Sequence, residues 1–556
     1  MVSLGKLLTL LPLLASAVQA ATKDDWRSRS IYQLITDRFA GGDQEHCTLG
    51  ARHYCGGNWR AIIDKLDYIQ GMGFDAVWIS PTAAGYEGYS KYGANYHGYW
   101  TVDPTQLNSH FGTADDLKAL SSALHSRGMY LMVDIAINAI ASTNYRLDQA
   151  VLDNENNGRN LFKDPSNYHE RCNIQWGDHH SEEYCWLVSG GGDGLDIALK
   201  DLATETPAVA NVLKNWVKGY VQEYGIDGFR LDASKHMSKQ FQHDFCQEAG
   251  IFCVGEVAGD NTAYAATYQG NDGIDSVFGF GMLYGAAAVF GNGKTMGTLK
   301  YYIEQAASSY SDPSVIASFL DNQDLPRFNS RTNDKSLVYN AIVSNFLYGG
   351  IPTVYYGLEQ DISDGPNDPE NREALGRYNN YATNGDTYKR ITQLNQIRNF
   401  LNKKGNFLKS VATVLKNQDN DIALQREDAL IVLTNRGSSG SGSWSIAGTK
   451  FGNNADVVDL LSCTKSKTDG SASLTVSWTN GQPFVFVTSP IAAEGGFCGA
   501  SAPGKRHFAG HSFDITGNND FAHSASVNSV VAGNGSSSTG TGKRSRSRNT
   551  VAGKLH

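Results

Sequence analysis

The stretch Gly228-Phe-Arg-Leu-Asp-Ala-Ser-Lys-His236 decides how this 556-residue chain is interpreted. Phe229 and Leu231 are apolar and typical of a buried strand, whereas the polar groups among them would not be buried without partners. Arg230 and Asp232 are two residues apart, so a strand places both side chains on one face. Such an arginine can hold the Asp232 carboxylate ionised and oriented, as a nucleophile requires. An isolated Arg-x-Asp, however, is more often a structural ion pair.

Two further carboxylates follow short apolar runs. Glu256 lies near the end of the run 252–257, and Asp324 follows the run 315–319. Acidic residues just past the ends of several short strands are typical of a parallel barrel whose site lies at the C-terminal ends of its strands. Two carboxylates facing each other across a sugar are the minimum equipment for cleaving a glycosidic bond. The three carboxylates together therefore favour a catalytic site.

The rest of the chain fits an α/β architecture in several parts. Apolar runs at 31–36, 74–79, 129–134 and 352–357 are typical of strands, and residues 113–127 have helical periodicity. Alternating strands and helices predict a TIM-type (β/α)8 barrel with parallel strands. The predicted parts are a signal peptide over 1–20, the barrel over 21–138 and 202–401, a small inserted domain over 139–201, a C-terminal antiparallel β-sandwich over 402–500, and a disordered Ser/Gly/basic tail over 501–556.

The net charge and the targeting signals of the chain indicate which class of partner it binds and where it is located. A net charge of -9 and a pI near 5.9 argue against nucleic acid or an anionic membrane, and a neutral polymer fits better. Lys6, the apolar run 7–14 and the small residues that follow predict a secretory signal peptide. No later stretch is long and apolar enough for a membrane span. We expect a secreted monomer, extracellular or in the cell wall, whose eight cysteines form disulfides. The one glycosylation sequon, at Asn534, lies in the tail.

From about Trp26 to Cys498 the chain resembles the fungal α-amylases of glycoside hydrolase family 13, with family-like runs such as residues 112–120. The resemblance implies that Asp232 is the nucleophile, that Glu256 is the general acid/base, and that Asp324 is the third carboxylate, which binds sugar hydroxyls and distorts the ring. It also implies that Arg230 holds the nucleophile, and that Lys235 and His236 line the acceptor side.

Two other segments carry candidate substrate contacts. The stretch Asn95-Tyr-His-Gly-Tyr-Trp100 is dense in aromatic rings, and it fits a packing cluster on a loop as well as a binding surface. By resemblance, His97 binds the sugar at the cleavage subsite and Tyr99 stacks under it, with Trp100 beside them. The resemblance also places Asp368 and Arg372 on the donor side, although both fit ordinary surface charges equally well.

The resemblance further implies disulfide bonds and a bound metal ion. Three pairs of cysteines fall where the fungal amylases have disulfides: Cys47 with Cys55, Cys172 with Cys185, and Cys463 with Cys498. Pairing of Cys246 with Cys253 stays open. Family members bind a structural Ca²⁺ where the insertion meets the barrel, and calcium takes oxygen ligands. The matching positions are Asn138, Glu183, Asp201 and the backbone of His236; ordinary surface carboxylates are the alternative.

Two departures from the family bear on function. Ala139 and Gln323 stand where the family has histidines that donate hydrogen bonds to the sugar at the cleavage subsite. Losing one such donor costs on the order of 2 to 4 kcal/mol of transition-state stabilisation if nothing replaces it. Gln323 can still donate through its amide, whereas Ala139 cannot.

A cell-wall-associated branch of fungal relatives that lacks these histidines acts mainly as 4-α-glucanotransferases on maltooligosaccharides and is tied to wall α-glucan synthesis, and this chain looks like that branch. We therefore expect a retaining enzyme on α-1,4-glucans that hydrolyses slowly and passes the glycosyl group to a sugar 4-hydroxyl. The alternatives are an ordinary starch-degrading endo-α-amylase and a non-catalytic glucan-binding protein. The retained Asp232, Glu256 and Asp324 argue against the last.

Overall fold

The computed structural model describes residues 21–189, 196–365 and 367–499. The predicted signal peptide, the predicted tail with its sequon, and the glycine-rich segment 190–195 lie outside these residues. Within the described ranges, none of the helices has the length and apolar character that a bilayer span requires.

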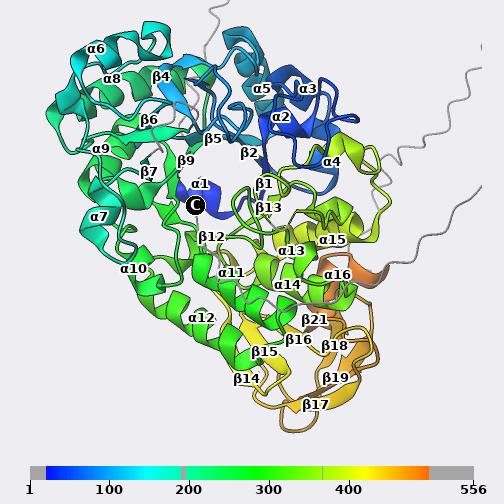
Figure 1. Ribbon diagram of the computed structural model, residues 1–556. Helices are drawn as coiled ribbons and strands as arrows, with labels where there is room; N and C mark the ends of the chain where they lie inside the picture. Colours follow the sequence, from blue (N-terminus) through cyan, green and yellow to red (C-terminus); the bar gives the residue numbers. More distant parts are fainter. Residues whose placement is uncertain (1–20, 190–195, 366, 500–556) are drawn as a thin grey trace, which may run out of the picture. The chain divides into compact units, whose positions relative to one another are not determined.

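Eight parallel strands form the central sheet (Figure 1). In chain order they are β1 Ile31–Leu34, β2 Ala76–Ile79, β5 Tyr130–Ile135, β9 Gly228–Leu231, β10 Phe252–Gly255, β11 Ser276–Val277, β12 Ala317–Ser318 and β13 Ile351–Tyr355. Consecutive strands pair in that order from β1 to β11, β12 pairs with β13, and β13 pairs back onto β1. A parallel bridge from Phe278, which follows β11, to Ala317 of β12 links the two edges and closes the barrel. The predicted barrel is confirmed.

The short sixth strand, β11, is the barrel strand that the apolar runs of the sequence do not reveal. It has two residues, too few for any periodicity, and it is defined by its pairing with Val254 and Gly255. The run 315–319 is likewise reduced to the two residues of β12. Barrel closure, rather than local sequence, defines these two strands.

Helices with one apolar face surround the sheet. In α5 (Ala114–His125), Leu117, Leu120 and Leu124 are buried at helical spacing, and Thr113 caps the first turn through a capping box with Asp116. The other long helices are α8 Pro207–Tyr224, α9 Lys239–Ala249, α12 Met296–Ser309, α14 Lys335–Leu347 and α15 Asp386–Leu401. Shorter ones are α1 Lys23–Arg27, α2 Thr36–Phe39, α3 Trp59–Ile63, α4 Leu66–Gly71, α10 Thr262–Ala266, α11 Phe280–Ala286 and α13 Phe328–Arg331.

Two additions to the barrel come between strands. Strands β3 (Ala83–Gly85) and β4 (Thr101–Leu107) form an antiparallel pair after β2. After β5, the predicted insertion is present as a small antiparallel sheet of β6 (Ala139–Ser142), β8 (Ala198–Asp201) and β7 (Val188–Ser189). Its helices are α6 Gln149–Asn154 and α7 His179–Tyr184.

The C-terminal part is the predicted antiparallel β-sandwich. Its larger sheet contains β14 Thr413–Asn417, β15 Asp421–Arg426, β16 Ala429–Thr434, β21 Phe484–Thr488, β18 Asp456–Asp459 and β19 Lys465–Lys467. Strands β17 (Gly442–Ile446) and β20 (Leu474–Trp478) form the second sheet. Trp444 and Trp478 of this second sheet pack with Val432 and Phe486 of the first in one buried cluster. Helix α16 (Ser489–Glu494) follows.

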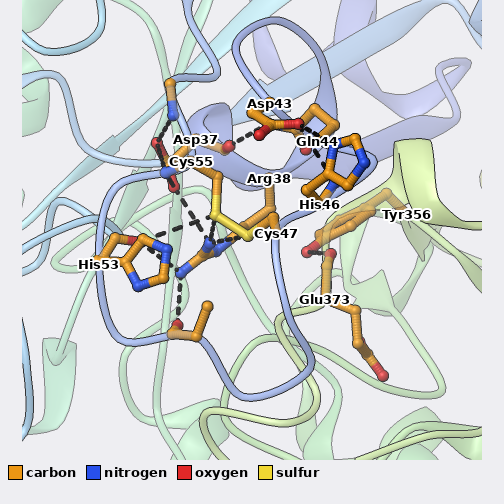
Figure 2. The surroundings of a disulfide bond; sticks show 12 residues. Asp37, Arg38, Asp43, Gln44, His46, Cys47, His53, Cys55, Tyr356 and Glu373 are labelled. Atoms are coloured by element: carbon orange, nitrogen blue, oxygen red, sulfur yellow. Dashed lines mark hydrogen bonds and ion pairs between the residues drawn. A yellow bond between two sulfur atoms is a disulfide. The ribbon is translucent and has the colours of Figure 1, made fainter.

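All eight cysteines are paired. The three disulfides implied by the resemblance are present, and Cys246 on α9 is bonded to Cys253 on β10. Figure 2 shows Arg38 beside the Cys47–Cys55 disulfide, where its guanidinium donates to the carbonyls of Ala51 and His53. The loop that follows β1 is therefore held by both a covalent bond and a buried cation.

The glycine that opens β9 supports a stability prediction. A Cβ atom on Gly228 would lie 2.7 Å from Cζ2 of Trp26, which is fully buried and donates from Nε1 to the carbonyl of Asp227 at 2.9 Å. We expect Gly228→Ala to lower the free energy of unfolding by about 1 to 3 kcal/mol, because the core must shift to fit the methyl group. Urea unfolding followed by tryptophan fluorescence measures this change.

A second glycine provides the matched control. Gly219 lies inside α8, and a Cβ atom there would meet nothing within 4 Å. We expect Gly219→Ala to raise the free energy of unfolding by about 0.5 to 1 kcal/mol, because alanine has the higher helix propensity. Two changes of the same sign would contradict this account of the packing around β9.

Candidate active site

The three predicted carboxylates lie at the C-terminal ends of barrel strands. Asp232 follows β9 directly, Glu256 follows β10 directly, and Asp324 lies in the loop after β12. The backbone N–H of Glu256 donates to the carbonyl of Leu231 at 3.0 Å, and that of Asp232 donates to the carbonyl of Ile135 at 3.0 Å. Hydrogen bonding between the strands therefore continues up to the two acidic residues and fixes where they leave the barrel.

Arg230 forms ion pairs with Asp232, with Glu256 and with a further carboxylate, that of Asp134. Its Nη1 lies 2.5 Å from Oδ1 of Asp232 and 2.9 Å from Oδ1 of Asp134, and its Nη2 lies 2.8 Å from Oε2 of Glu256. Only 1% of the arginine is exposed. The predicted pairing of Arg230 with Asp232 is present. It is part of a larger network, which includes residues of neighbouring strands and could not be predicted from one strand alone.

Asp134 is the residue of this network that the sequence analysis did not single out. It lies near the end of β5, is 1% exposed, and accepts hydrogen bonds from Tyr99 Oη at 2.8 Å and Trp78 Nε1 at 3.2 Å. Burial raises its pKa to about 6, and Arg230 opposes that shift. The signal was available, because Asp134, like Asp232 and Glu256, is an acid at the end of an apolar run.

The acidic residues influence one another electrostatically. Burial raises the pKa of Asp232, the positive charge of Arg230 opposes this, and Glu256 and Asp134 add to the rise. Burial also raises the pKa of Asp324 to about 6, against the effect of Arg372. Fractions of 18% of the Asp232 side chain and 35% of the Asp324 side chain are exposed, so both carboxylates reach solvent.

A second arginine organises the other side of the site. Arg372 is buried, and its guanidinium lies 3.0 Å from Oδ1 of Asp324 and 3.1 Å from Oδ1 of Asp368, while its Nε donates to the carbonyl of Gln323 at 2.9 Å. Arg372 is therefore part of the site and is not an ordinary surface charge. Asp368 is half exposed and lies at the rim of the same network.

The aromatic segment 95–100 lies in the same region. His97 is buried, and its Nδ1 accepts a hydrogen bond from the backbone N–H of Tyr99 at 3.0 Å. Its ring lies 5.7 Å from that of Tyr99 and 4.8 Å from that of Trp100. Burial, together with Arg372 and Arg38, holds the pKa of His97 well below its usual value. The ring is therefore neutral with its proton on Nε2, which leaves Nε2 as a donor.

Ala139 and Gln323, the two positions at which the resemblance implies histidines, provide no exposed donor. Ala139 is buried in β6, where it pairs with Asp201. Gln323 is fully buried, and its Oε1 accepts from Nε2 of Gln33 at 2.5 Å. Its own Nε2 is covered by protein and has no hydrogen-bond partner among the described residues.

Lys235 and His236 connect the site to the inserted segment. Both belong to the short helix η3 (Ser234–His236) that follows Asp232. Lys235 Nζ lies 2.8 Å from Oε1 of Glu182, and His236 Nδ1 donates to the carbonyl of the same Glu182 at 2.6 Å. Glu182, which is 1% exposed, is a second residue that the sequence analysis did not single out.

The candidate calcium ligands fit oxygen coordination in part. Asp201 is fully buried; its Oδ2 lies 2.6 Å from Nδ1 of His169, and its Oδ1 has no partner among the described residues. Burial raises the pKa of Asp201 to about 7, and Glu205 and Glu183 add to the rise. The adjacent Asn138 is also buried. Within the described ranges, no group of three or more His, Cys, Asp and Glu side chains is arranged to hold a metal, so a site here would need the amide and backbone oxygens.

Comparison with known proteins agrees with this geometry. Residues 33–406 match the family model for the α-amylase catalytic domain, and residues 414–506 match that for α-amylase domain C. The α-amylase of Saccharomycopsis fibuligera is 40% identical over 477 residues, which cover 85% of this chain and 93% of the relative. Alpha-amylase 2 of Schwanniomyces occidentalis is 40% identical over 483 residues, 85% of this chain and 92% of that protein.

Solved structures show the same relationship. The α-amylase from Malbranchea cinnamomea superposes with a TM-score of 0.80 at 40% identity, over 86% of this chain and all of that one. An α-amylase from Geobacillus thermoleovorans, solved with acarbose, gives a TM-score of 0.69 at 27% identity, over 83% of this chain and 98% of that one. With a catalytic-domain match across most of the barrel and relatives at 40% identity over almost their whole length, this chain belongs to the α-amylase family.

Proposed function

We propose that this chain cleaves α-1,4-glucans with retention of configuration, using Asp232 as nucleophile, Glu256 as general acid/base and Asp324 as the carboxylate that binds the reacting sugar. The observation that carries the proposal is the Arg230 bridge, in which one guanidinium binds oxygens of both Asp232 and Glu256. This favours the short carboxylate separation of about 5 to 5.5 Å that is typical of retaining enzymes.

The proposed reaction has two steps. Asp232 attacks the anomeric carbon while Glu256 protonates the leaving oxygen, which gives a glycosyl ester on Asp232 and a released glucan chain. Glu256, now ionised, then takes a proton from the acceptor, whose oxygen attacks the same carbon and frees Asp232. Nε2 of His97 is a donor for a sugar hydroxyl beside this centre.

The acceptor in the second step can be water or a sugar hydroxyl. The relatives are named α-amylases, which favours hydrolysis as the main outcome. A specific observation favours 4-α-glucanotransfer as well: neither Ala139 nor Gln323 presents an exposed donor. Weaker stabilisation of the reacting sugar slows attack by water, whereas an acceptor sugar contributes binding energy of its own. We propose slow hydrolysis accompanied by transfer to maltooligosaccharides. A role in wall α-glucan synthesis rests on the sequence resemblance alone.

The products from a single pure substrate test this proposal. From maltoheptaose we expect oligosaccharides both shorter and longer than the substrate at early times, with new products in the α-configuration. Chromatography resolved over time, with reducing-end assays and NMR of the fresh products, measures both. Glu256→Gln is the control and should abolish the activity. Shorter products alone, with steady growth in reducing ends, would identify an ordinary α-amylase, and unchanged activity in Glu256→Gln would exclude this site.

Restoring a ring donor tests the effect of the lost histidines. We expect Gln323→His to raise kcat/KM for hydrolysis at least tenfold, because one donor at such a site is worth roughly 10² to 10³ in rate when well placed. Gln323→Leu, with a similar volume and no donor, should give no increase. Equal values for the two variants would mean that a missing donor at this position does not limit the rate.

We further propose that Ca²⁺ binds where the insertion meets the barrel, held by Asp201, Asn138, Glu183 and the carbonyl of His236. The support is the buried Oδ1 of Asp201, which has no partner among the described residues. A bound cation would stabilise this carboxylate in its ionised form. Its contribution would be structural, because it would join the insertion to the helix that follows Asp232.

Removal of calcium tests this second proposal. Saturation at 100 times Kd stabilises the folded state by about 2.7 kcal/mol, so EDTA should lower the thermal unfolding midpoint by several degrees, and added Ca²⁺ should restore it. Asp201→Asn should remove this response, whereas Glu170→Gln, a change to an exposed carboxylate in the same segment, should keep it. An unfolding midpoint that does not respond to EDTA or Ca²⁺ in the unsubstituted protein would exclude the site.

A further inference from the structure

Two buried glutamines bond to each other inside the barrel. Nε2 of Gln33, on β1, donates to Oε1 of Gln323, in the loop after β12, at 2.5 Å. Gln33 is 2% exposed, and Gln323 is fully buried. The same bond forms if both carboxamides are flipped, because each carries an N–H donor and a carbonyl acceptor. The pairing therefore does not depend on which end of each amide is the nitrogen.

Gln33 faces the interior of the barrel. It lies two residues after Ile31, which belongs to one buried cluster with Ala76 of β2, and residues two apart on a strand share a face. Gln33 is also paired in register with Trp78, whose indole donates to the carboxylate of Asp134. The Gln33 carboxamide is therefore next to the residues that support the charged network of the candidate active site.

Gln323 reaches β1 from two strands away. Strand β13 lies between β1 and β12 in the sheet (Figure 1). The backbone carbonyl of Gln323 accepts from Nε of Arg372 at 2.9 Å and from Nδ2 of Asn371 at 3.0 Å. These bonds hold the main chain, whereas Gln33 is the one hydrogen-bond partner of the Gln323 side chain among the described residues. The side chain can therefore change rotamer without a shift of its loop if that partner is lost.

The side chain that follows Gln323 is turned toward solvent. Of the Asp324 side chain, 35% is exposed, whereas the adjacent carboxamide is covered. A buried amide without a hydrogen-bond partner costs free energy that it recovers when it reaches water or a ligand hydroxyl. Because Nε2 of Gln323 already lacks a partner among the described residues, the bond to Gln33 is the interaction that favours the buried position.

We propose that Gln33 is a positioning residue that holds the Gln323 carboxamide inside the barrel, away from the reacting sugar, and that it thereby favours transfer over hydrolysis. Held in this way, Gln323 does not donate to a hydroxyl of the sugar beside Asp324. The weaker stabilisation slows attack by water more than attack by an acceptor sugar, which contributes binding energy of its own. This inference rests on the proposed function, because it takes Asp324 as the carboxylate that binds the reacting sugar.

Removal of the Gln33 amide tests this inference. Gln33→Leu keeps a similar volume and cannot bond to Gln323, so the Gln323 carboxamide should turn toward the sugar. We expect kcat/KM for hydrolysis of maltoheptaose to rise by roughly 3- to 10-fold, on the scale of one neutral hydrogen bond. The ratio of transfer products to hydrolysis products should fall by a similar factor. A role of Gln33 in packing alone would not raise the rate of hydrolysis.

A second substitution shows whether Gln33 acts through Gln323. In the Gln323→Leu protein, the addition of Gln33→Leu should leave kcat/KM within about twofold, because no carboxamide remains to turn. A rise of the same size in that background would overturn the inference. If the unsubstituted protein is active and Gln33→Leu alone gives no rise, the inference also fails, while the proposed function stands.

Asn395 on α15 provides a matched control. It is also a buried amide, its Nδ2 donates to the carbonyl of Met72 at 2.8 Å, and its Oδ1 has no partner among the described residues. Asn395→Leu should lower the thermal unfolding midpoint and leave kcat/KM unchanged. A higher kcat/KM in Asn395→Leu would overturn the inference, because loss of any buried amide would then have the effect assigned to Gln33.

If the unsubstituted protein cleaves no glucan, the proposed function fails and the inference is judged on binding. Gln33→Leu should then lower the Kd for maltoheptaose by about the same factor, because the sugar gains a donor, and the Gln323→Leu background should remove this effect. Isothermal titration calorimetry measures both. An unchanged Kd in Gln33→Leu would overturn the inference.

Discussion

The buried guanidinium of Arg230 is the charge on which the site depends. A buried cation costs several kcal/mol of folding free energy unless anions neutralise it, and here Asp134, Asp232 and Glu256 do so. The dependence is mutual, because three neighbouring carboxylates repel one another without the cation. The ends of β5, β9 and β10 are therefore held in one arrangement by electrostatics as well as by the barrel. Loss of any one partner would leave a buried charge uncompensated.

Arg372 is a second buried cation that holds carboxylates in place, on another side of the barrel. It binds Asp324 from the loop after β12, and it also binds Asp368 from its own loop after β13. Two neighbouring loops are thus fixed by one buried cation, and the third carboxylate is held where the other two can face it. The barrel strands alone could not do this, because Asp324 lies several residues beyond the end of its strand.

The three carboxylates could be predicted from the sequence because each follows an apolar run, and a parallel barrel brings the C-terminal ends of its strands to one side. Asp134 also ends an apolar run, but its contact with Arg230 depends on the pairing of β5 with β9, which the sequence alone does not show. Strand β11 could not be predicted, because a two-residue strand is defined by its neighbours. Of Glu182 and Glu183, local pattern cannot tell which one meets Lys235, because that depends on how α7 lies against the barrel.

The site therefore combines two properties that respond differently to sequence change. Its charges form a connected network in which each member neutralises another, so removal of one leaves a buried charge without its partner. Positions 139 and 323 belong to no such network: Ala139 is buried in β6, and Gln323 accepts a hydrogen bond from Gln33. The side chains at these two positions can therefore change while the carboxylates stay in place. The chemistry of glycosyl transfer would then persist, and the binding of an acceptor by side chains outside the network would decide what receives the sugar.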